Sequence, residues 1–404
     1  MSTLLGSAAR DRQDVAALTH RLVAASSQNP GEDERRVAEL VEEICGELGL
    51  PRPVRVGTAA RPNLLIEIPF GAGGSRLGLC GHLDTKPVGE GDWSTDPLVA
   101  TQVDGELRGR GVVDMKGAIA AMLLAAADLV AQPPEAGSLL IALLSDEENG
   151  ATYGGQWLAD HHPVSVDAMV IGEPGGFFED WDRLHLGSRG ICNFDLEVTT
   201  DQGHSSLRDV FELTSATEVA ARLVVALRDE FVPPYPGDQP GKPTLNPGVV
   251  LEGGINYGVL PGWARVASEC RLVPGMQQDA FVAALEVLIE AHTPPGASVQ
   301  LVVRNWIPAA AIDANNPIVE AARESLKATL GWVPTDAIFP ATTDATWFAA
   351  MGVATLPALG PGLLRHAHAV DERVSIEHLE LARALFRDLA RRYCGGPSSP
   401  TRAS

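Results

Sequence analysis

The chain has 404 residues, of which 45% are hydrophobic and 21% are charged. This length favours two domains, and the composition is that of a packed globular protein rather than a disordered one. The formal net charge of −21 argues against nucleic acid and anionic membranes as partners, because both bind through clustered Lys and Arg.

The cysteines and the hydropathy pattern indicate a cytoplasmic location. Five cysteines lie far apart and form no CxxC pair, which predicts free thiols rather than a disulfide framework. The first residues lack the pattern of a secretory signal, and no run of 18 apolar residues occurs. We therefore expect a soluble cytoplasmic protein.

In the first part of the chain, strand-like and helical patterns alternate. Polar residues follow the strands, which predicts an open α/β sheet that binds ligands at the carboxyl ends of its strands. In chain order the expected elements are helical periodicity over 11–48, strands at 63–68 and 76–80, an Ala-rich helix from about 117, a buried strand at 138–144, a helix at 154–160 and a strand at 167–171.

From about Gly187 the pattern changes to half-buried strands in the order β-α-β-β-α-β, which resembles a ferredoxin-like module. Its expected elements are strands at 191–200, 249–251, 263–272 and 298–303, with helices at 209–230 and 278–291. From Pro317 the pattern again predicts α/β structure, with helices at 317–330, 345–351 and 376–393 and strands at 336–339 and 353–357. We therefore predict a catalytic domain formed by 1–186 and 305–394, an inserted domain at 187–304 and a flexible tail at 395–404.

Residues that suit metal ions stand at the predicted strand ends or in Gly-rich turns. Imidazole and carboxylate groups together bind Zn²⁺ and related ions, and a bridging carboxylate can hold two ions about 3.5–4 Å apart. The residues of this type are His82, Asp84, Asp114, Glu147, Glu148, Glu173 and His368. Together they predict a hydrolase that uses two metal ions.

Each of these residues alone has a simpler interpretation. Asp84 before Thr-Lys-Pro is a good turn former, and Asp114 fits a helix N-cap. Glu147 and Glu148 can be solvated charge at a strand end, and His366 is as plausible a surface histidine as His368. Adjacent glutamates can also divide the work, one as a ligand and the other as a base.

The motifs as a set resemble the co-catalytic zinc aminoacylase/carboxypeptidase family, which includes acetylornithine deacetylase, succinyl-diaminopimelate desuccinylase, glutamate carboxypeptidase and several dipeptidases. The resemblance extends from about Asp11 to Tyr393. Its motifs are GHLDTKP at 81–87, GRGVVDMKG at 109–117, SDEENG at 145–150, GEP at 172–174, GHSS at 203–206, TTDA at 342–345 and HAVDE at 368–372. The family fold implied is a mixed-sheet zinc hydrolase domain with an inserted α+β ferredoxin-like dimerisation domain.

The resemblance also implies a role for each matching residue of the metal site. His82 and Glu173 correspond to ligands of one zinc ion, Glu148 and His368 to ligands of the other, and Asp114 to the bridge. Glu147 corresponds to the general base, and Asp84 to the residue that orients His82. The implied cofactor is two divalent ions per chain, with Zn²⁺ expected and Co²⁺ or Mn²⁺ possible with the same ligands.

The inserted domain is expected to complete the substrate site. By the same resemblance, His204 stabilises the oxyanion in the active site of a partner subunit, which implies a homodimer, and Arg271 binds a substrate carboxylate. The family usually has Asn where this chain has Gly258, and Asn256 lies nearby in a different register. Asn256 is therefore a candidate substrate contact, and the substrate pocket differs from the family pattern.

The expected activity is hydrolysis of the amide bond of an N-acyl amino acid or a related small substrate that carries a carboxylate. A carboxypeptidase or dipeptidase is the alternative within the same chemistry, and hydrolytic deamination at a non-amide C–N bond is a further one. A non-catalytic binding protein is disfavoured because Glu147 is present with the complete ligand set.

Overall fold

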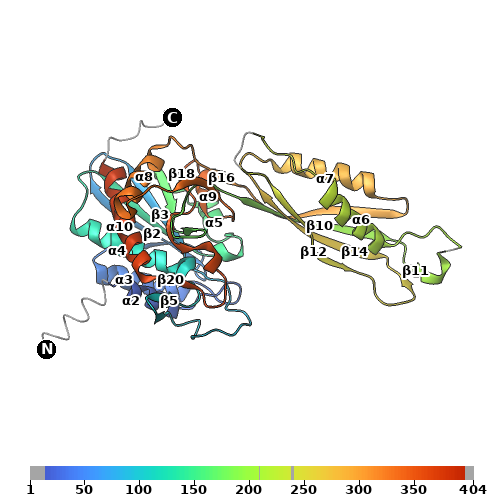
Figure 1. Ribbon diagram of the computed structural model, residues 1–404, viewed down its shortest axis with the longest axis horizontal. Coiled ribbons are helices and arrows are strands. Elements are labelled where there is room, and N and C mark those ends of the chain that lie inside the picture. Colours follow the sequence, from blue (N-terminus) through green and yellow to red (C-terminus); the bar gives the residue numbers. More distant parts are fainter. Residues whose placement is uncertain (1–13, 209, 238–240, 396–404) are drawn as a thin grey trace. The chain divides into compact units, whose positions relative to one another are not determined.

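The structure is a computed structural model that describes residues 14–208, 210–237 and 241–395, so the predicted tail lies outside the described residues except for Gly395. The chain divides into two compact units (Figure 1). Among the described residues, the first unit comprises 14–187, 311–339 and 343–395, and the second comprises 188–208, 210–237 and 241–310 with 340–342. The second unit extends beyond the predicted end at 304 because strand β15 continues through Ile307.

A six-stranded mixed sheet forms the centre of the first unit. In sheet order its strands are β1 (Val54–Gly57), β2 (Pro62–Gly71), β6 (Gly137–Leu144), β3 (Arg76–His82), β7 (Ala168–Ile171) and β18 (Ala354–Leu356). The pairs β1–β2 and β2–β6 are antiparallel, whereas β6, β3, β7 and β18 run parallel. The predicted α/β sheet is thus confirmed, and the carboxyl ends of β3, β6 and β7 meet at one edge.

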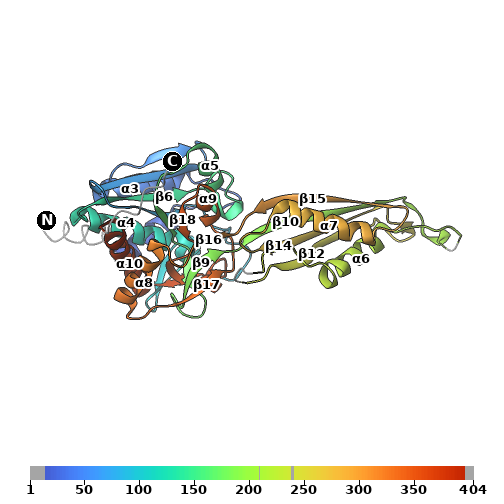
Figure 2. The ribbon, with the colours of Figure 1, turned by 90° about the horizontal axis from the view of Figure 1, so that it is seen from above.

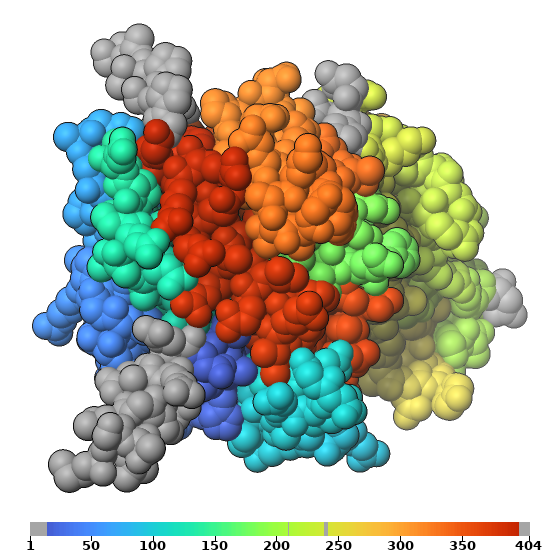
Figure 3. Space-filling view, turned by 60° about the vertical axis from the view of Figure 1, so that its left-hand side comes forward, coloured from blue at the N-terminus to red at the C-terminus, as the bar shows by residue number. Residues whose placement is uncertain are grey.

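Helices of the first unit pack on this sheet. They are α2 (Val15–Ala24), α3 (Arg35–Leu48), α4 (Gly117–Ala131), α5 (Gly155–His161), α8 (Pro317–Leu330), α9 (Ala345–Ala350) and α10 (Ile376–Gly395). The small side chains of α4 are almost all buried, and α4 contacts both α2 and α10. Figure 3 shows α10 (red) beside α8 (orange) at the surface.

Short strands, most of which the sequence analysis did not predict, connect the loops of the first unit. They are β4 (Thr101–Val103), β5 (Glu106–Arg108), β8 (Pro174–Gly176), β9 (Arg183–Ser188), β16 (Ala310–Ala311), β17 (Thr335–Phe339), β19 (Gly360–Leu363) and β20 (Arg373–Ser375), of which only β17 was expected. Strand β20 pairs with β5, so the segment before residue 373 lies against the segment after residue 108.

The second unit is a four-stranded antiparallel sheet with two helices, α6 (Ala216–Asp229) and α7 (Gln278–His292), on one face (Figure 2). In sheet order its strands are β12 (Thr244–Gly253), β14 (Trp263–Leu272), β10 (Gly190–Thr200) and β15 (Ala297–Ile307), which confirms the predicted β-α-β-β-α-β succession. Phe281 of α7 packs against the rings of Phe194 and Trp306 from the sheet. A small hairpin adds β11 (Gly203–His204) and β13 (Val259–Leu260).

The predicted start of one helix was wrong, and the helical periodicity near the start of the chain was confirmed. The helix expected from residue 209 begins at Ala216, because Ser215 has extended backbone angles and precedes the first helical residue. The helical periodicity over 11–48 belongs to two helices, with a break that contains Asn29-Pro30-Gly31. Among the described residues, the structure contains no helix of sufficient length and apolar character to cross a membrane.

Candidate metal centre

The predicted metal ligands of the first unit come from strand ends and the loops beside them. His82 is the last residue of β3, and Glu173 lies two residues after β7. Glu147 and Glu148 begin a short 3₁₀ turn (Glu147–Asn149) after β6. Asp114 lies in the irregular turn Val112–Lys116 that leads into α4, and His368 lies in the loop before β20. Because β3, β6 and β7 are parallel neighbours, their ends bring these side chains to one place.

Asp114 stands between two histidines. Its Oδ1 atom lies 2.8 Å from His82 Nε2, and its Oδ2 atom lies 3.1 Å from His368 Nε2. Each imidazole also faces a glutamate, with 3.5 Å from His82 Nε2 to Glu173 Oε1 and 3.1 Å from His368 Nε2 to Glu148 Oε2. The two oxygens of one carboxylate therefore point to two different donor sets, which is what a bridging ligand requires.

Two overlapping sets of donor atoms are compact enough to hold a metal ion. One consists of His82, Asp114 and Glu148, and the other of His82, Glu147 and Glu173, with the donor atoms of each set within 4.8 Å of one another. These sets divide the residues differently from the partition implied by the family resemblance. The assignment of each side chain to one of two ions therefore stays a prediction.

The concentration of acidic groups fits divalent cations. Burial, together with the charge of Asp114, raises the pKa of Glu173 to about 7, although His82 opposes the shift. Burial likewise raises the pKa of Asp344, a residue of the TTDA motif, to about 7. Buried carboxylates repel one another unless a cation compensates them, and oxygen and imidazole donors suit Zn²⁺ and its neighbours.

Asp84 faces His82 through both its backbone oxygen and its carboxylate. His82 Nδ1 lies 3.0 Å from the backbone oxygen of Asp84 and 3.5 Å from its Oδ1 atom. From these distances we assign the ring proton to Nδ1, which leaves Nε2 free to bind a metal. The Asp84 carboxylate also accepts from the backbone N–H groups of Glu147 and Glu148, at 3.2 and 3.1 Å.

Asn29 completes the support of Asp84, and no motif in the sequence identified it. Its Nδ2 group donates to Asp84 Oδ2 at 2.9 Å and to Asp146 Oδ1 at 2.8 Å. All three side chains are buried, and Asp146 has a positive φ of 65° directly before Glu147. Asn29 thus connects the end of β3 to the turn that carries Glu147 and Glu148.

Glu147 has the environment of a group that can take up a proton. Burial raises its pKa well above the usual range for glutamate, and the charges of Glu173 and Asp344 add to this while His82 opposes it. The centre also opens to solvent on one side, because the His368 side chain is 48% exposed whereas that of His82 is 1% exposed. Of the two histidines weighed from the sequence, His368 is the one whose ring contacts Asp114 and Glu148.

The candidates of the second unit lie on its surface. His204 is exposed, and its Nδ1 atom accepts from Ser206 N at 3.3 Å, with Ser206 Oγ at 2.8 Å. Arg271 Nε donates to Glu269 Oε1 at 2.9 Å, so a substrate carboxylate would share or replace that partner. Asn256 uses its Oδ1 atom to accept from Tyr257 N at 2.8 Å, and Gly258 has a φ of 81° that suits glycine.

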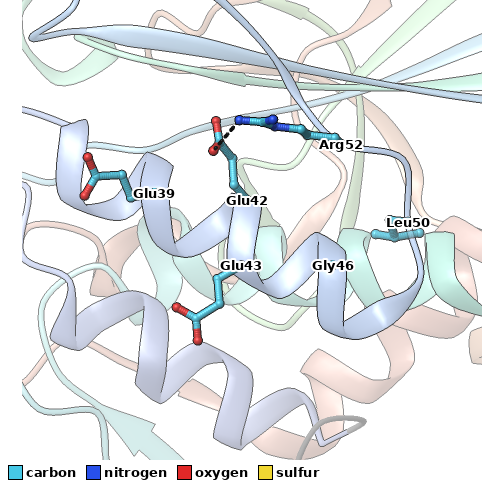
Figure 4. Close-up of a pocket in the computed structure, with 6 residues that line it drawn as sticks. All are labelled: Glu39, Glu42, Glu43, Gly46, Leu50 and Arg52. Carbon is cyan, nitrogen blue, oxygen red and sulfur yellow. Dashed lines mark ion pairs between the residues drawn. The ribbon is translucent and has the colours of Figure 1, made fainter.

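A surface hollow on α3 is a different kind of site. Figure 4 shows that it is lined by side chains that include none of the predicted ligands, namely Glu39, Glu42, Glu43, Gly46, Leu50 and Arg52. Glu42 pairs with Arg52 and Arg55, which makes this a salt-bridged surface rather than a metal centre.

The family comparison covers most of the chain. The model described as peptidase family M20/M25/M40 matches residues 78–392. A succinyl-diaminopimelate desuccinylase of Xanthomonas campestris pv. campestris is 30% identical over 388 residues, with 94% of this chain and 98% of the relative covered. The desuccinylase of Phenylobacterium zucineum is 29% identical over 389 residues, with the same coverage.

Solved structures share the fold at lower identity. Aminopeptidase PepT from Bacillus cereus has a TM-score of 0.76 at 18% identity and covers 95% of this chain and 98% of its own. The M20 family metallo-carboxypeptidase Sso-CP2 from Sulfolobus solfataricus has a TM-score of 0.73 at 19% identity, with 93% and 98% covered. These similarities establish the architecture of both units.

Proposed function

The chain belongs to peptidase family M20/M25/M40, and we propose that it is a metal-dependent amide hydrolase that removes the acyl group from an N-acyl amino acid or a related small carboxylate. The observation that carries this proposal is the position of Asp114 between His82 and His368, with Glu147 beside the same donors. Both curated relatives named above are desuccinylases, which favours a deacylase over a peptidase.

The proposed cofactor is two divalent ions, with Zn²⁺ expected and Co²⁺ or Mn²⁺ as alternatives. The residues that would hold them are His82, Asp114, Glu148, Glu173 and His368. When bound, such ions supply Lewis-acid stabilisation of the negative charge that develops at the carbonyl oxygen and make water more acidic.

Glu147 is proposed as the general base and acid. Its carboxylate takes a proton from the attacking water and returns it to the leaving amine nitrogen as the C–N bond breaks, and its raised pKa suits both transfers. Asp84 and Asn29 hold the backbone turn from which Glu147 projects.

The second unit is proposed to contribute substrate contacts and a homodimer interface. We assign His204 to oxyanion stabilisation across the dimer, and Arg271 to the substrate carboxylate. Asn256 is the weaker candidate, because its side-chain oxygen already accepts from Tyr257 N. Strand β12 is an edge strand with exposed Val249 and Leu251, which supports pairing with another chain. The five buried free cysteines agree with the proposed cytoplasmic location.

The test combines metal analysis with a substrate panel. The purified chain should contain about two ions and hydrolyse N-succinyl or N-acetyl amino acids, whereas Glu147→Gln should keep the ions and lose at least ~100-fold in kcat. Glu135→Gln is a matched control, because Glu135 is exposed. Preference for dipeptides would favour the peptidase alternative. Two ions without amide hydrolysis would refute the proposed reaction, and a folded chain without metal would refute the cofactor.

A further inference from the structure

Glu372 lies where the loops that carry Asp114 and His368 meet. It precedes β20, whose pairing with β5 places the residues before 373 against those after 108. Gly109 N donates to the backbone oxygen of Glu372 at 3.0 Å, which continues this pairing by one further bond. The Glu372 side chain is completely buried, at 0% exposure. A buried carboxylate at such a junction requires several hydrogen-bond donors.

One oxygen of Glu372 holds the segment that leads to Asp114. Glu372 Oε1 accepts from the backbone N–H groups of Gly111, Val113 and Asp114, at 2.9, 3.1 and 3.2 Å. The backbone here is irregular, since Asp114 has φ −127° and ψ 89° in the turn that precedes α4. Three N–H groups that no regular helix or strand satisfies thus converge on one carboxylate oxygen.

The other oxygen reaches His368 through Arg110. Glu372 Oε2 accepts from Arg110 Nη1 at 2.7 Å, and Arg110 Nη2 donates to the backbone oxygen of His368 at 3.2 Å. His368 has a φ of 61°, a conformation that non-glycine residues adopt only where surrounding contacts hold them. Arg110 is also 4% exposed and lies over the ring of Trp93. The guanidinium therefore forms a fixed link between Glu372 and the His368 backbone.

We propose that Glu372 is a positioning residue that, with Arg110, fixes Asp114 and His368 relative to each other and so sets the affinity for the ion that the family resemblance assigns to Asp114, Glu148 and His368. This inference rests on the proposed function for the presence of two ions, and on the family resemblance for the division of the ligands between them. Two of the three ligands of that ion depend on Glu372. Of the ligands assigned to the other ion, namely His82, Asp114 and Glu173, only Asp114 depends on Glu372. His82 belongs to β3 and is held by Asp84. Loss of the Glu372 contacts therefore affects the two ions unequally.

Two variants separate this role from a general effect on folding. In Glu372→Gln one side-chain oxygen becomes an amide NH₂, which cannot accept a hydrogen bond, so one of the two connections is lost. Arg110→Lys keeps the positive charge, but a single ammonium group cannot bridge Glu372 and the His368 oxygen as the two guanidinium nitrogens do. Glu377→Gln is the matched control, because it makes the same chemical change at an exposed position five residues further along.

The experiment is a Co²⁺ titration of the metal-stripped full-length chain by calorimetry, with the visible absorption of bound Co²⁺ recorded in parallel. We expect the first ion to bind within about twofold of wild type, and the second to bind at least ~10-fold more weakly in Glu372→Gln and Arg110→Lys. Glu377→Gln should bind both ions as wild type does. Thermal unfolding of each variant shows that the chain compared is folded, and Arg110→Lys decides the question if Glu372→Gln does not fold.

Two results would overturn the proposal. Wild-type binding of both ions in folded variants would mean that Glu372 does not position the ligands. An equal loss for both ions would mean a general structural role. The amide-hydrolysis panel is read separately: a wild-type chain that binds two ions but hydrolyses no amide refutes the proposed reaction, while the Co²⁺ titration still tests Glu372.

Discussion

Replacement of His185 by glutamine tests whether one buried imidazole makes the first unit sensitive to acid. His185 lies in β9 and is completely buried. Its Nε2–H group donates to the backbone oxygen of Gly175 at 2.9 Å, and its ring packs against Phe177 and Phe339 at centroid distances of 5.0 and 5.1 Å. Burial lowers its pKa to about 4, although the Gly175 contact opposes the shift.

The sign of the effect follows from proton binding. The unfolded chain binds a proton at His185 near the ordinary pKa of 6.5, whereas the folded chain does so only near 4. Stability from the neutral, buried ring is therefore fully present above pH 6.5 and is lost as the pH falls towards 4. The difference between these two pKa values corresponds to roughly 3 kcal/mol of unfolding free energy.

The assay is urea unfolding of the metal-stripped chain at several pH values between 8 and 4. Glutamine keeps an N–H donor for the Gly175 oxygen but does not titrate, so the wild type should lose roughly 3 kcal/mol relative to His185→Gln over this range. His162→Gln, at an exposed position, should show no such change and serves as the control. A difference between wild type and His185→Gln that is constant with pH would refute the reasoning.

Three further predictions concern the remaining parts of the fold. Asn29→Ala should lower the unfolding free energy by about 1–3 kcal/mol, because it leaves the buried Asp84 and Asp146 carboxylates without their shared donor; a loss below about 0.5 kcal/mol in denaturant melts would contradict this. Phe281→Ala should destabilise the second unit by about 3–5 kcal/mol, because packing in its core is lost. Amide hydrogen exchange of that unit measures the effect. Exchange protection unchanged from wild type would be inconsistent with the structure. Chelation of the ions should lower Tm. The metal-free chain should also lose stability as the pH rises from 6 to 8, because Glu173 and Asp344, each with a pKa of about 7, must then ionise while buried. A metal-free Tm that does not depend on pH in this range would argue against this prediction.

Much of the architecture follows from local sequence patterns. The continuous apolar run at 138–144 and the alternation at 191–200 predicted β6 and β10, because burial on two faces or on one face leaves a different hydrophobic period. The short strands β4, β5 and β20 were not predicted because each has only three residues, too few to show a hydrophobic period. The start of α6 was misplaced because a backbone angle at Ser215, rather than a hydrophobic pattern, sets it.

The chemical classes of the centre were also evident from the sequence. Residues at or just after the ends of parallel strands lie at the carboxyl edge of the sheet. The sequence alone therefore predicts that His82, Glu147 and Glu173 lie near one another at that edge. Their mutual geometry could not be assigned in this way. That Asp114 directs one oxygen to each of two histidines depends on an irregular turn and on a loop more than two hundred residues further along the chain.

By itself, then, the sequence determined the order of elements and the residue types at the strand ends, since both depend on neighbours along the chain. Only the tertiary structure decided that Asn29 supports Asp84 and that Glu372 joins two loops. These contacts connect residues remote in sequence, and their donors and acceptors are paired by the packing of the whole unit. No local hydrophobic period in the sequence predicts which donor pairs with which acceptor.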